Sequence, residues 1–108
     1  MITQGAVASL RRKLAAVTQQ LAHGAAVDKA LVQRAREIER KLTHDLKVLR
    51  RGEARAATDY QRQWFRASYQ ELLSDRQRAR RVQSVILQRQ AEQKRREAQP
   101  IAHREGEL

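Results

Sequence analysis

The sequence predicts an all-α fold, namely an antiparallel up-down-up bundle of three helices with a long third helix. The 108 residues include only four glycines and one proline, and most of the others are Ala, Arg, Gln, Glu or Leu, which favour helices. Apolar residues recur at steps of three and four, which places them on one face of a helix and fits no strand. Aromatic residues make up only 4% of the chain, so we expect thin apolar seams between helices within a single domain.

The first predicted helix spans residues 3–22, with Thr3 as its expected N-cap. Gly24 follows the last apolar residue and can adopt the left-handed conformation that closes a helix. We therefore expect the chain to turn at Gly24. The apolar stripe of this helix consists of Val7, Leu10, Leu14, Val17 and Leu21.

The second predicted helix spans residues 28–51, with Asp28 as its N-cap and Gly52 as its stop. Residues 53–57 are nevertheless good helix formers, and an isolated Gly costs only about 1 kcal/mol inside a helix. A single long helix that runs through Gly52 therefore stays open as an alternative. The apolar stripe here consists of Leu31, Ala35, Ile38, Leu42, Leu46 and Leu49.

The third predicted helix spans residues 58–97, and Thr58 with Gln61 forms a capping-box pattern at its start. At 1.5 Å per residue this helix is about 60 Å long, so we expect its C-terminal part to project from the bundle. Two polar residues, Ser68 and Asp75, fall on its apolar stripe. Either they lie near a solvated end of the bundle, or the helix is rotated from this assignment. The stripe reads Phe65, Ser68, Leu72, Asp75, Ala79, Val82 and Ile86.

We thus expect residues 1–97 to form the bundle. Residues 98–108 are expected to form a disordered linker or tail, because Pro100 ends the helix. The chain has no cysteine, and His23, His44 and His103 fall in a loop, on the second helix and in the tail. No phosphate-binding glycine loop and no catalytic triad is recognisable. We therefore expect no enzyme, no metal and no cofactor.

A net charge of +11 predicts attraction to anionic surfaces, such as acidic proteins, phospholipid headgroups or nucleic acid. Nucleic-acid binding would need exposed aromatic residues or a recognition helix beside the arginines. The aromatic residues instead gather at residues 60–69, where the core needs bulk. We expect most of the charge to form a solvated face, so that nucleic acid is a disfavoured partner and only weak contact with an anionic membrane stays open. No apolar run approaches the ~20 residues of a membrane-spanning helix.

Several segments carry a family resemblance. Phe65-Arg-Ala-Ser-Tyr-Gln-Glu-Leu72, followed by Asp75-Arg-Gln77, is similar to the third helix of the syntaxin N-terminal Habc domain. Ile2-Thr-Gln4 and the turn at Gly24 resemble its first helix and turn, and Thr43-His-Asp-Leu46-Lys47 resembles part of its second helix. The endosomal and vacuolar Qa-SNAREs are the most similar members, and the resemblance covers residues 2–90. Two departures stand out: the stretch between Leu46 and Phe65 is short, and Asp75 replaces an apolar residue.

The resemblance implies a regulatory N-terminal domain of a syntaxin-like SNARE in vesicle trafficking and membrane fusion. Such a domain binds its own SNARE helix, SNARE partners, or SM-type and tethering proteins, in the manner of a helix in a groove. It would lie on the cytoplasmic face of an endosomal, vacuolar or Golgi membrane, as part of a longer anchored protein. The groove lies between the second and third helices, and its candidate residues here are Arg34, Lys41, Tyr69, Leu73, Arg76 and Arg80.

Two other interpretations stay open. A free-standing coiled-coil hairpin, such as a stalk-like or chaperone-like component of a secretion apparatus, would also be short, rich in Arg, Gln and Ala, and free of cysteine. It predicts two long helices, the second running through Gly52, with almost no packing of a third helix. A basic helical nucleic-acid-binding protein is the third interpretation. A reversal of the backbone between Arg51 and Thr58 favours the Habc-like bundle, and a straight helix there contradicts it.

Overall fold

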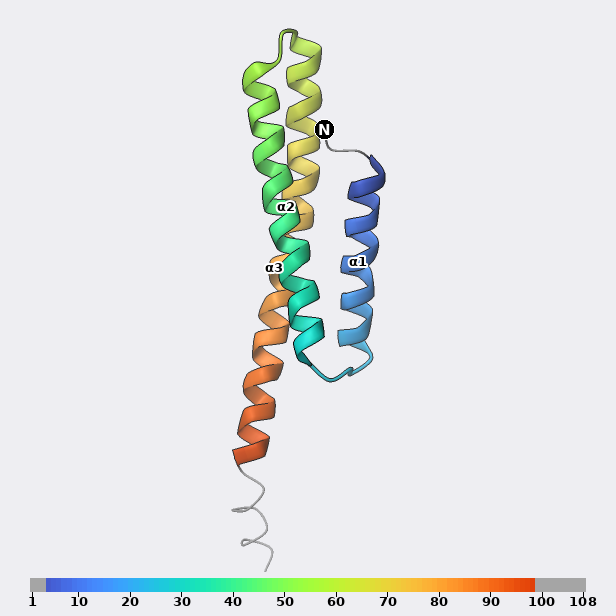
Figure 1. Cartoon of the computed structure of the whole chain (residues 1–108), viewed down its shortest axis with the longest axis vertical. Coiled ribbons are helices and arrows are strands. Elements are labelled where there is room, and N and C mark those ends of the chain that lie inside the picture. Colours follow the sequence, from blue (N-terminus) through green and yellow to red (C-terminus); the bar gives the residue numbers. More distant parts are fainter. Residues whose placement is uncertain (1–3, 99–108) are drawn as a thin grey trace, which may run out of the picture.

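The structure is a computed structural model that describes residues 4–98, which form three α-helices (Figure 1). They are α1 (Gln4–Ala22), α2 (Lys29–Arg55) and α3 (Asp59–Ala98). Each helix runs antiparallel to the one before it, and α3 extends well past the start of α2 (Figure 1). The predicted all-α, up-down-up bundle with a long third helix is confirmed. Thr3 and residues 99–108, on which the predicted cap and most of the predicted tail fall, lie outside the described residues.

The turn between α1 and α2 is built from local hydrogen bonds that the sequence specifies. Gly24 has a φ of +75°, and its N–H donates to the carbonyl oxygen of Leu21 over 3.2 Å. The N–H of Ala25 donates to the carbonyl oxygen of Gln20 over 2.9 Å, which completes a Schellman motif. Asp28 then caps α2, because its Oδ1 accepts from the N–H of Leu31 over 2.8 Å.

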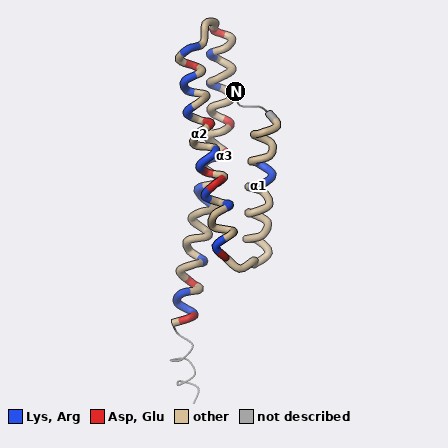
Figure 2. Tube along the Cα trace, in the orientation of Figure 1, with Lys and Arg blue, Asp and Glu red and all other residues tan. Residues whose placement is uncertain are grey.

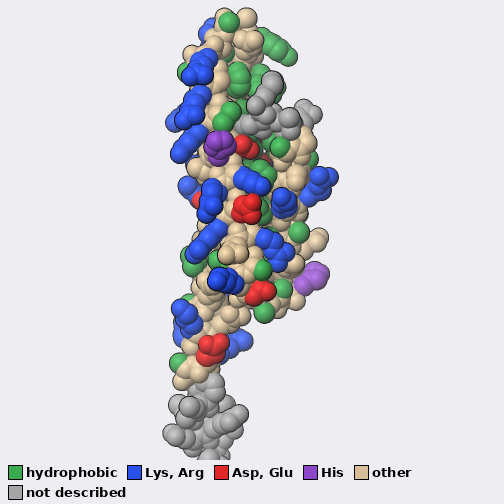
Figure 3. All heavy atoms as spheres, viewed as in Figure 1, with side chains coloured by type: hydrophobic (Ala, Val, Ile, Leu, Met, Phe, Trp, Pro, Cys, Tyr) green, Lys and Arg blue, Asp and Glu red, His purple; other side chains and the backbone are tan. Residues whose placement is uncertain are grey.

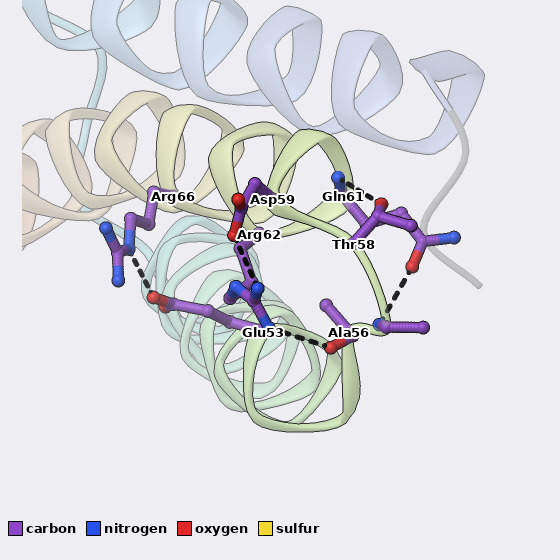
Figure 4. A network of polar contacts seen from close by, with 8 residues as sticks. Glu53, Ala56, Thr58, Asp59, Gln61, Arg62 and Arg66 are labelled. Atoms are coloured by element: carbon purple, nitrogen blue, oxygen red, sulfur yellow. Dashed lines mark hydrogen bonds and ion pairs between the residues drawn. The ribbon is translucent and has the colours of Figure 1, made fainter.

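The second turn reverses the chain at residues 56–58 (Figure 4). The hydroxyl of Thr58 accepts from the N–H of Gln61 over 3.1 Å, and the Gln61 side chain accepts in return from the N–H of Ala57 over 3.0 Å. Arg62 donates to the carbonyl oxygen of Ala56 and to the carboxylate of Asp59. The reversal contradicts a straight helix through residues 51–58.

Gly52 does not end α2, which continues to Arg55, so the predicted stop is wrong. The role of Gly52 is instead to admit the ring of Phe65 from α3. A Cβ atom at Gly52 would lie 2.4 Å from Cε1 and 2.6 Å from Cζ of that ring, closer than atoms can approach. The glycine is therefore required by packing between two helices rather than by helix termination.

The core is a seam along the three predicted stripes, which face one another over the length of α1. α2 contributes its whole stripe, from Leu31 to Leu49. α1 contributes Leu10, Leu14, Val17 and Leu21, and α3 contributes Leu72, Ala79, Val82 and Ile86. Val7, Val32, Phe65, Tyr69 and Leu73 are partly buried against this seam.

α2 and α3 keep a constant antiparallel register. Glu39 accepts from Arg80 over 3.0 Å, the guanidinium of Arg50 lies 5.3 Å from the ring centre of Tyr69, and Glu53 pairs with Arg66. The separation between Glu39 and Glu53 along α2 equals the separation between Arg66 and Arg80 along α3. The two helices therefore form one continuous hairpin, and α1 packs beside only part of it (Figure 1).

Asp75 lies in the middle of this core, with only 1% of its surface exposed. Its carboxylate accepts from Nε of Arg11 on α1 over 2.9 Å and from the guanidinium of Arg78 on α3. Arg11 also lies 3.7 Å from the carboxylate of Glu71. Both predicted explanations for Asp75, a solvated end and a rotated helix, are wrong. The residue lies on the predicted face and is neutralised by an arginine from another helix.

We predict that Gly52→Ala destabilises the protein although alanine is the better helix former. The added methyl group overpacks the Phe65 contact at a cost of about 1–3 kcal/mol, which outweighs the gain in helix propensity of about 1 kcal/mol. Urea unfolding followed by circular dichroism measures the change. In a Phe65→Leu background the same substitution should become stabilising, and a loss of equal size in both backgrounds would refute the packing explanation.

We predict that Arg11→Ala lowers the free energy of unfolding by about 1–3 kcal/mol, because it leaves a buried carboxylate with one partner fewer. Replacing Asp75 with leucine in the same chain should restore much of that stability, since no charge then stays buried. Arg12→Ala removes an exposed neighbour of the same chemistry and is the matched control. Equal losses for the two arginines would show that the ion pair contributes nothing specific.

Candidate protein-binding site

The six residues predicted to line one groove lie on two sides of α2. Arg34 and Lys41 lie on the side of α2 that borders α1. Tyr69 and Arg80 contact the opposite side of α2, at Arg50 and Glu39. The structure therefore brings Arg34 and Lys41 together, but not with the four residues on α3.

The remaining two α3 residues follow the same stripe as Tyr69 and Arg80. Leu73 is partly buried against the core, and Arg76 is half-buried. Nε of Arg76 is buried and has no hydrogen-bond partner among the described residues. Arg80 is exposed, but Glu39 bridges it to α2. Ligand binding by these four residues stays a prediction.

A groove follows the seam between α1 and α2. Its first part has a volume of about 190 Å³, with an apolar floor and charged residues at its edges. The lining residues are Leu10, Lys13, Ala16 and Val17 of α1 and Arg34, Glu37, Ile38 and Lys41 of α2.

A second, more open hollow of about 500 Å³ continues the first toward the start of α1. The two hollows share Leu10, Lys13 and Lys41, so we treat them as one feature, the α1–α2 groove. The additional lining residues are Ala6, Ser9, Arg40, His44 and Asp45.

The edges of the α1–α2 groove are mostly basic. Lys41 lies 3.4 Å from Glu37, but Lys13, Arg34 and Arg40 form no ion pair within residues 4–98. Lysine and arginine occur along the whole of α2, and side chains of both signs line the face on which α1 and α2 meet (Figures 2 and 3). The groove therefore presents unpaired positive charge beside an apolar floor.

Asp45 is the acidic group inside the wider part of the groove. Burial raises the pKa of its carboxyl, and the neighbouring His44 and Lys41 offset part of that rise. The rise means that the charged form of Asp45 is less stable here than that of a fully solvated carboxyl group.

Within residues 4–98, His, Asp and Glu do not gather in any group of three that could hold a metal ion. His23 lies in the first turn and His44 on α2, while His103 lies outside the described residues. Of the three described helices, none combines the length and the apolar composition that crossing a membrane requires.

Comparison of the chain with protein-family models, curated proteins and solved structures gave no significant match. The fold and the chemistry of its surfaces are therefore the observations from which a function can be argued.

Sequence reasoning missed the α1 side of the groove, above all Lys13 and Ala16. The sequence shows that Arg34 and Lys41 share one face of a helix. It does not show that α1 borders this face, since the apolar stripes are equally compatible with α1 or α3 as the neighbour. One signal was present in the sequence: Ala16 is a small residue among the larger ones of α1, and it leaves space beside the apolar stripe.

Proposed function

We propose that this chain is a non-catalytic protein-binding module that holds an acidic amphipathic helix in the α1–α2 groove. The observation that carries the proposal is the apolar floor bordered by Lys13, Arg34 and Arg40, none of which forms an ion pair within the described part of the chain. An amphipathic helix places apolar side chains on such a floor and acidic side chains beside such edges.

Electrostatics favours this class of partner over others. The net charge of +11 attracts an acidic helix from a distance and repels another copy of the same chain. Charge complementarity of this kind mainly raises the association rate and the selectivity, while the apolar contact slows dissociation. The proposed partner must therefore supply both an apolar stripe and acidic flanks.

A more specific form of the proposal is the regulatory N-terminal domain of a syntaxin-like SNARE. The three-helix fold and the reversal at residues 56–58 support it. Its occupant would be the SNARE helix of the same protein, or an SM-type or tethering protein, at an endomembrane. In this form the occupant would lie beside α1 and α2, because Tyr69 and Arg80 are engaged with α2 on the other side.

A second candidate is a coiled-coil hairpin component of a secretion apparatus. It is favoured by the continuous register of α2 and α3 and by the helical state of Gly52. The hairpin differs from the expected one, since α2 and α3 form it and α1 packs against it.

The groove proposal is tested with a synthetic amphipathic peptide that has leucines on one face and glutamates on its flanks. We predict that it binds the protein, that added salt weakens binding, and that Ala16→Trp abolishes it by filling the groove. Fluorescence anisotropy of the labelled peptide measures the affinity.

Ala15→Trp is the matched control, because Ala15 is also exposed on α1 but does not line the groove. It should leave the affinity unchanged. A peptide with lysines in place of the glutamates should not bind. Equal binding of the two peptides, or equal effects of the two tryptophans, would contradict the proposal.

A chain that begins at residue 27 separates the two candidates. The bundle predicts that this chain loses its cooperative thermal transition, because the removal of α1 exposes Leu31, Ile38 and Leu42 to water. The free-standing hairpin predicts that the transition survives. Circular dichroism at increasing temperature distinguishes the outcomes.

A further inference from the structure

The tip of the α2–α3 hairpin leaves two aromatic side chains exposed to solvent. Tyr60 is 79% exposed and Trp64 is 44% exposed. Beside Trp64 lies a hollow of about 300 Å³ between the two helices. We call this region the tip surface, and its lining residues are Val48, Leu49, Arg51, Gly52, Arg55, Trp64 and Phe65.

The tip surface is open because α1 does not extend along it. The start of α1 lies near His44 and Asp45 on α2, so the described part of α1 ends below the tip (Figure 1). Exposed aromatic residues that cluster in this way mark interaction sites more often than single ones do. Val85 and Leu87 are also exposed, but positions two residues apart on a helix point in different directions and form no patch.

The walls of the hollow are shaped by the close approach of the two helices at Gly52. Phe65 packs on the backbone of Gly52, and Trp64 meets Phe65 edge to face, with ring centres 5.1 Å apart. Trp64 is thereby held beside a notch that has Val48 and Leu49 on its far side. Such a notch accommodates one large apolar side chain.

Of the arginines around the notch, those on α3 form ion pairs and those on α2 form none within the described residues. Arg62 and Arg66 on α3 are paired with Asp59 and Glu53 (Figure 4). Arg51 and Arg55, which line the notch from α2, are exposed and form no ion pair within residues 4–98. These two guanidinium groups favour a partner that brings carboxylates.

We propose that the tip surface is a second docking site, separate from the α1–α2 groove, for an acidic protein segment. The segment inserts one large apolar side chain beside Trp64 and places its carboxylates against Arg51 and Arg55. Tryptophan, tyrosine and arginine are the residues that dominate binding energy in protein interfaces, and all three occur here.

The same features argue against the other occupants. A second copy of the chain would bring a net charge of +11 to the same arginines. Single-stranded nucleic acid needs open aromatic faces and an uninterrupted track of cations. Trp64 and Phe65 instead pack edge to face against each other, and Glu53 and Asp59 interrupt the positive charge around the tip.

The experiment uses the full chain, in which Trp64 is the only tryptophan and therefore reports on the tip by its fluorescence. A phage-displayed library of short random peptides is selected on the wild-type protein, with an excess of the Arg51→Glu/Arg55→Glu variant in solution as competitor. We expect the selected peptides to be acidic and to carry one large apolar residue. Their binding should shift the Trp64 emission to shorter wavelength, and the variant should bind them about tenfold or more weakly.

Lys94→Glu/Arg95→Glu is the matched control, since it changes the net charge equally at exposed positions far along α3. It should bind the peptides as the wild type does, and Tyr60→Ser should weaken binding without changing the thermal transition. Ala16→Trp should have no effect here, so failure at the tip is distinguishable from failure in the groove. The proposal is overturned if no peptide survives the competition, if the selected peptides lack an acidic excess, or if single-stranded DNA shifts Trp64 emission at lower concentration than they do.

Discussion

The ion pair between Arg11 and Asp75 is the contact on which the placement of α1 depends. Apart from the ion pairs of Arg11 with Asp75 and Glu71, the packing of α1 against the other helices is aliphatic. Aliphatic contacts are non-directional, so they distinguish poorly between registers that differ by one helical turn. The ion pair is directional, because only one register brings Nε of Arg11 within 2.9 Å of the buried carboxylate. A shifted α1 would leave Asp75, 1% exposed, without its partner from α1. Lys13 and Ala16 follow Arg11 on the same helix, so the register that it selects also decides which residues of α1 face Arg34 and Lys41.

The hairpin of α2 and α3 depends on a different constraint, the close approach of the two helices at Gly52. Glu39, Arg50 and Glu53 follow one another along α2, and their partners on α3 follow in the reverse order, so the antiparallel register is maintained up to the tip. At the tip the ring of Phe65 occupies the place of a side chain at Gly52. A larger residue there would push the helices apart about one helical turn before the chain reverses at residues 56–58. Phe65 points inward at Gly52, whereas the neighbouring Trp64 stays 44% exposed, which links the packing of the tip to its proposed use.

Features of the fold and of the candidate site were predictable where the residues that determine them lie close together in the sequence. The Gly24 turn and the Asp28 cap involve neighbours within about one or two helical turns, so composition and spacing predicted them. Gly52 was misread as a stop because its partner, Phe65, lies on another helix. Asp75 was misjudged for the same reason, since a carboxylate within an apolar stripe gives no sign of which arginine neutralises it. Arg34 and Lys41 were grouped with residues of α3, although they border α1. Helical periodicity shows that the two residues share a face, whereas the handedness of the bundle decides which helix borders that face.

Two features explain why both proposed surfaces select acidic partners. The helices differ in length, and acidic residues form ion pairs within the molecule more often than basic residues do. A first helix as long as α2 would cover the tip, and burying Trp64 and Tyr60 would add to the apolar area removed from water, so stability alone gives no reason to leave them exposed. The acidic residues are largely engaged within the molecule: Glu39, Glu53 and Asp75 each pair with an arginine of another helix. Lys13, Arg34 and Arg40 at the groove and Arg51 and Arg55 at the tip form no ion pair within residues 4–98, so part of the excess positive charge lies where a partner would bind. A partner with carboxylates beside an apolar anchor therefore supplies the negative charge that the unpaired basic residues of both surfaces lack.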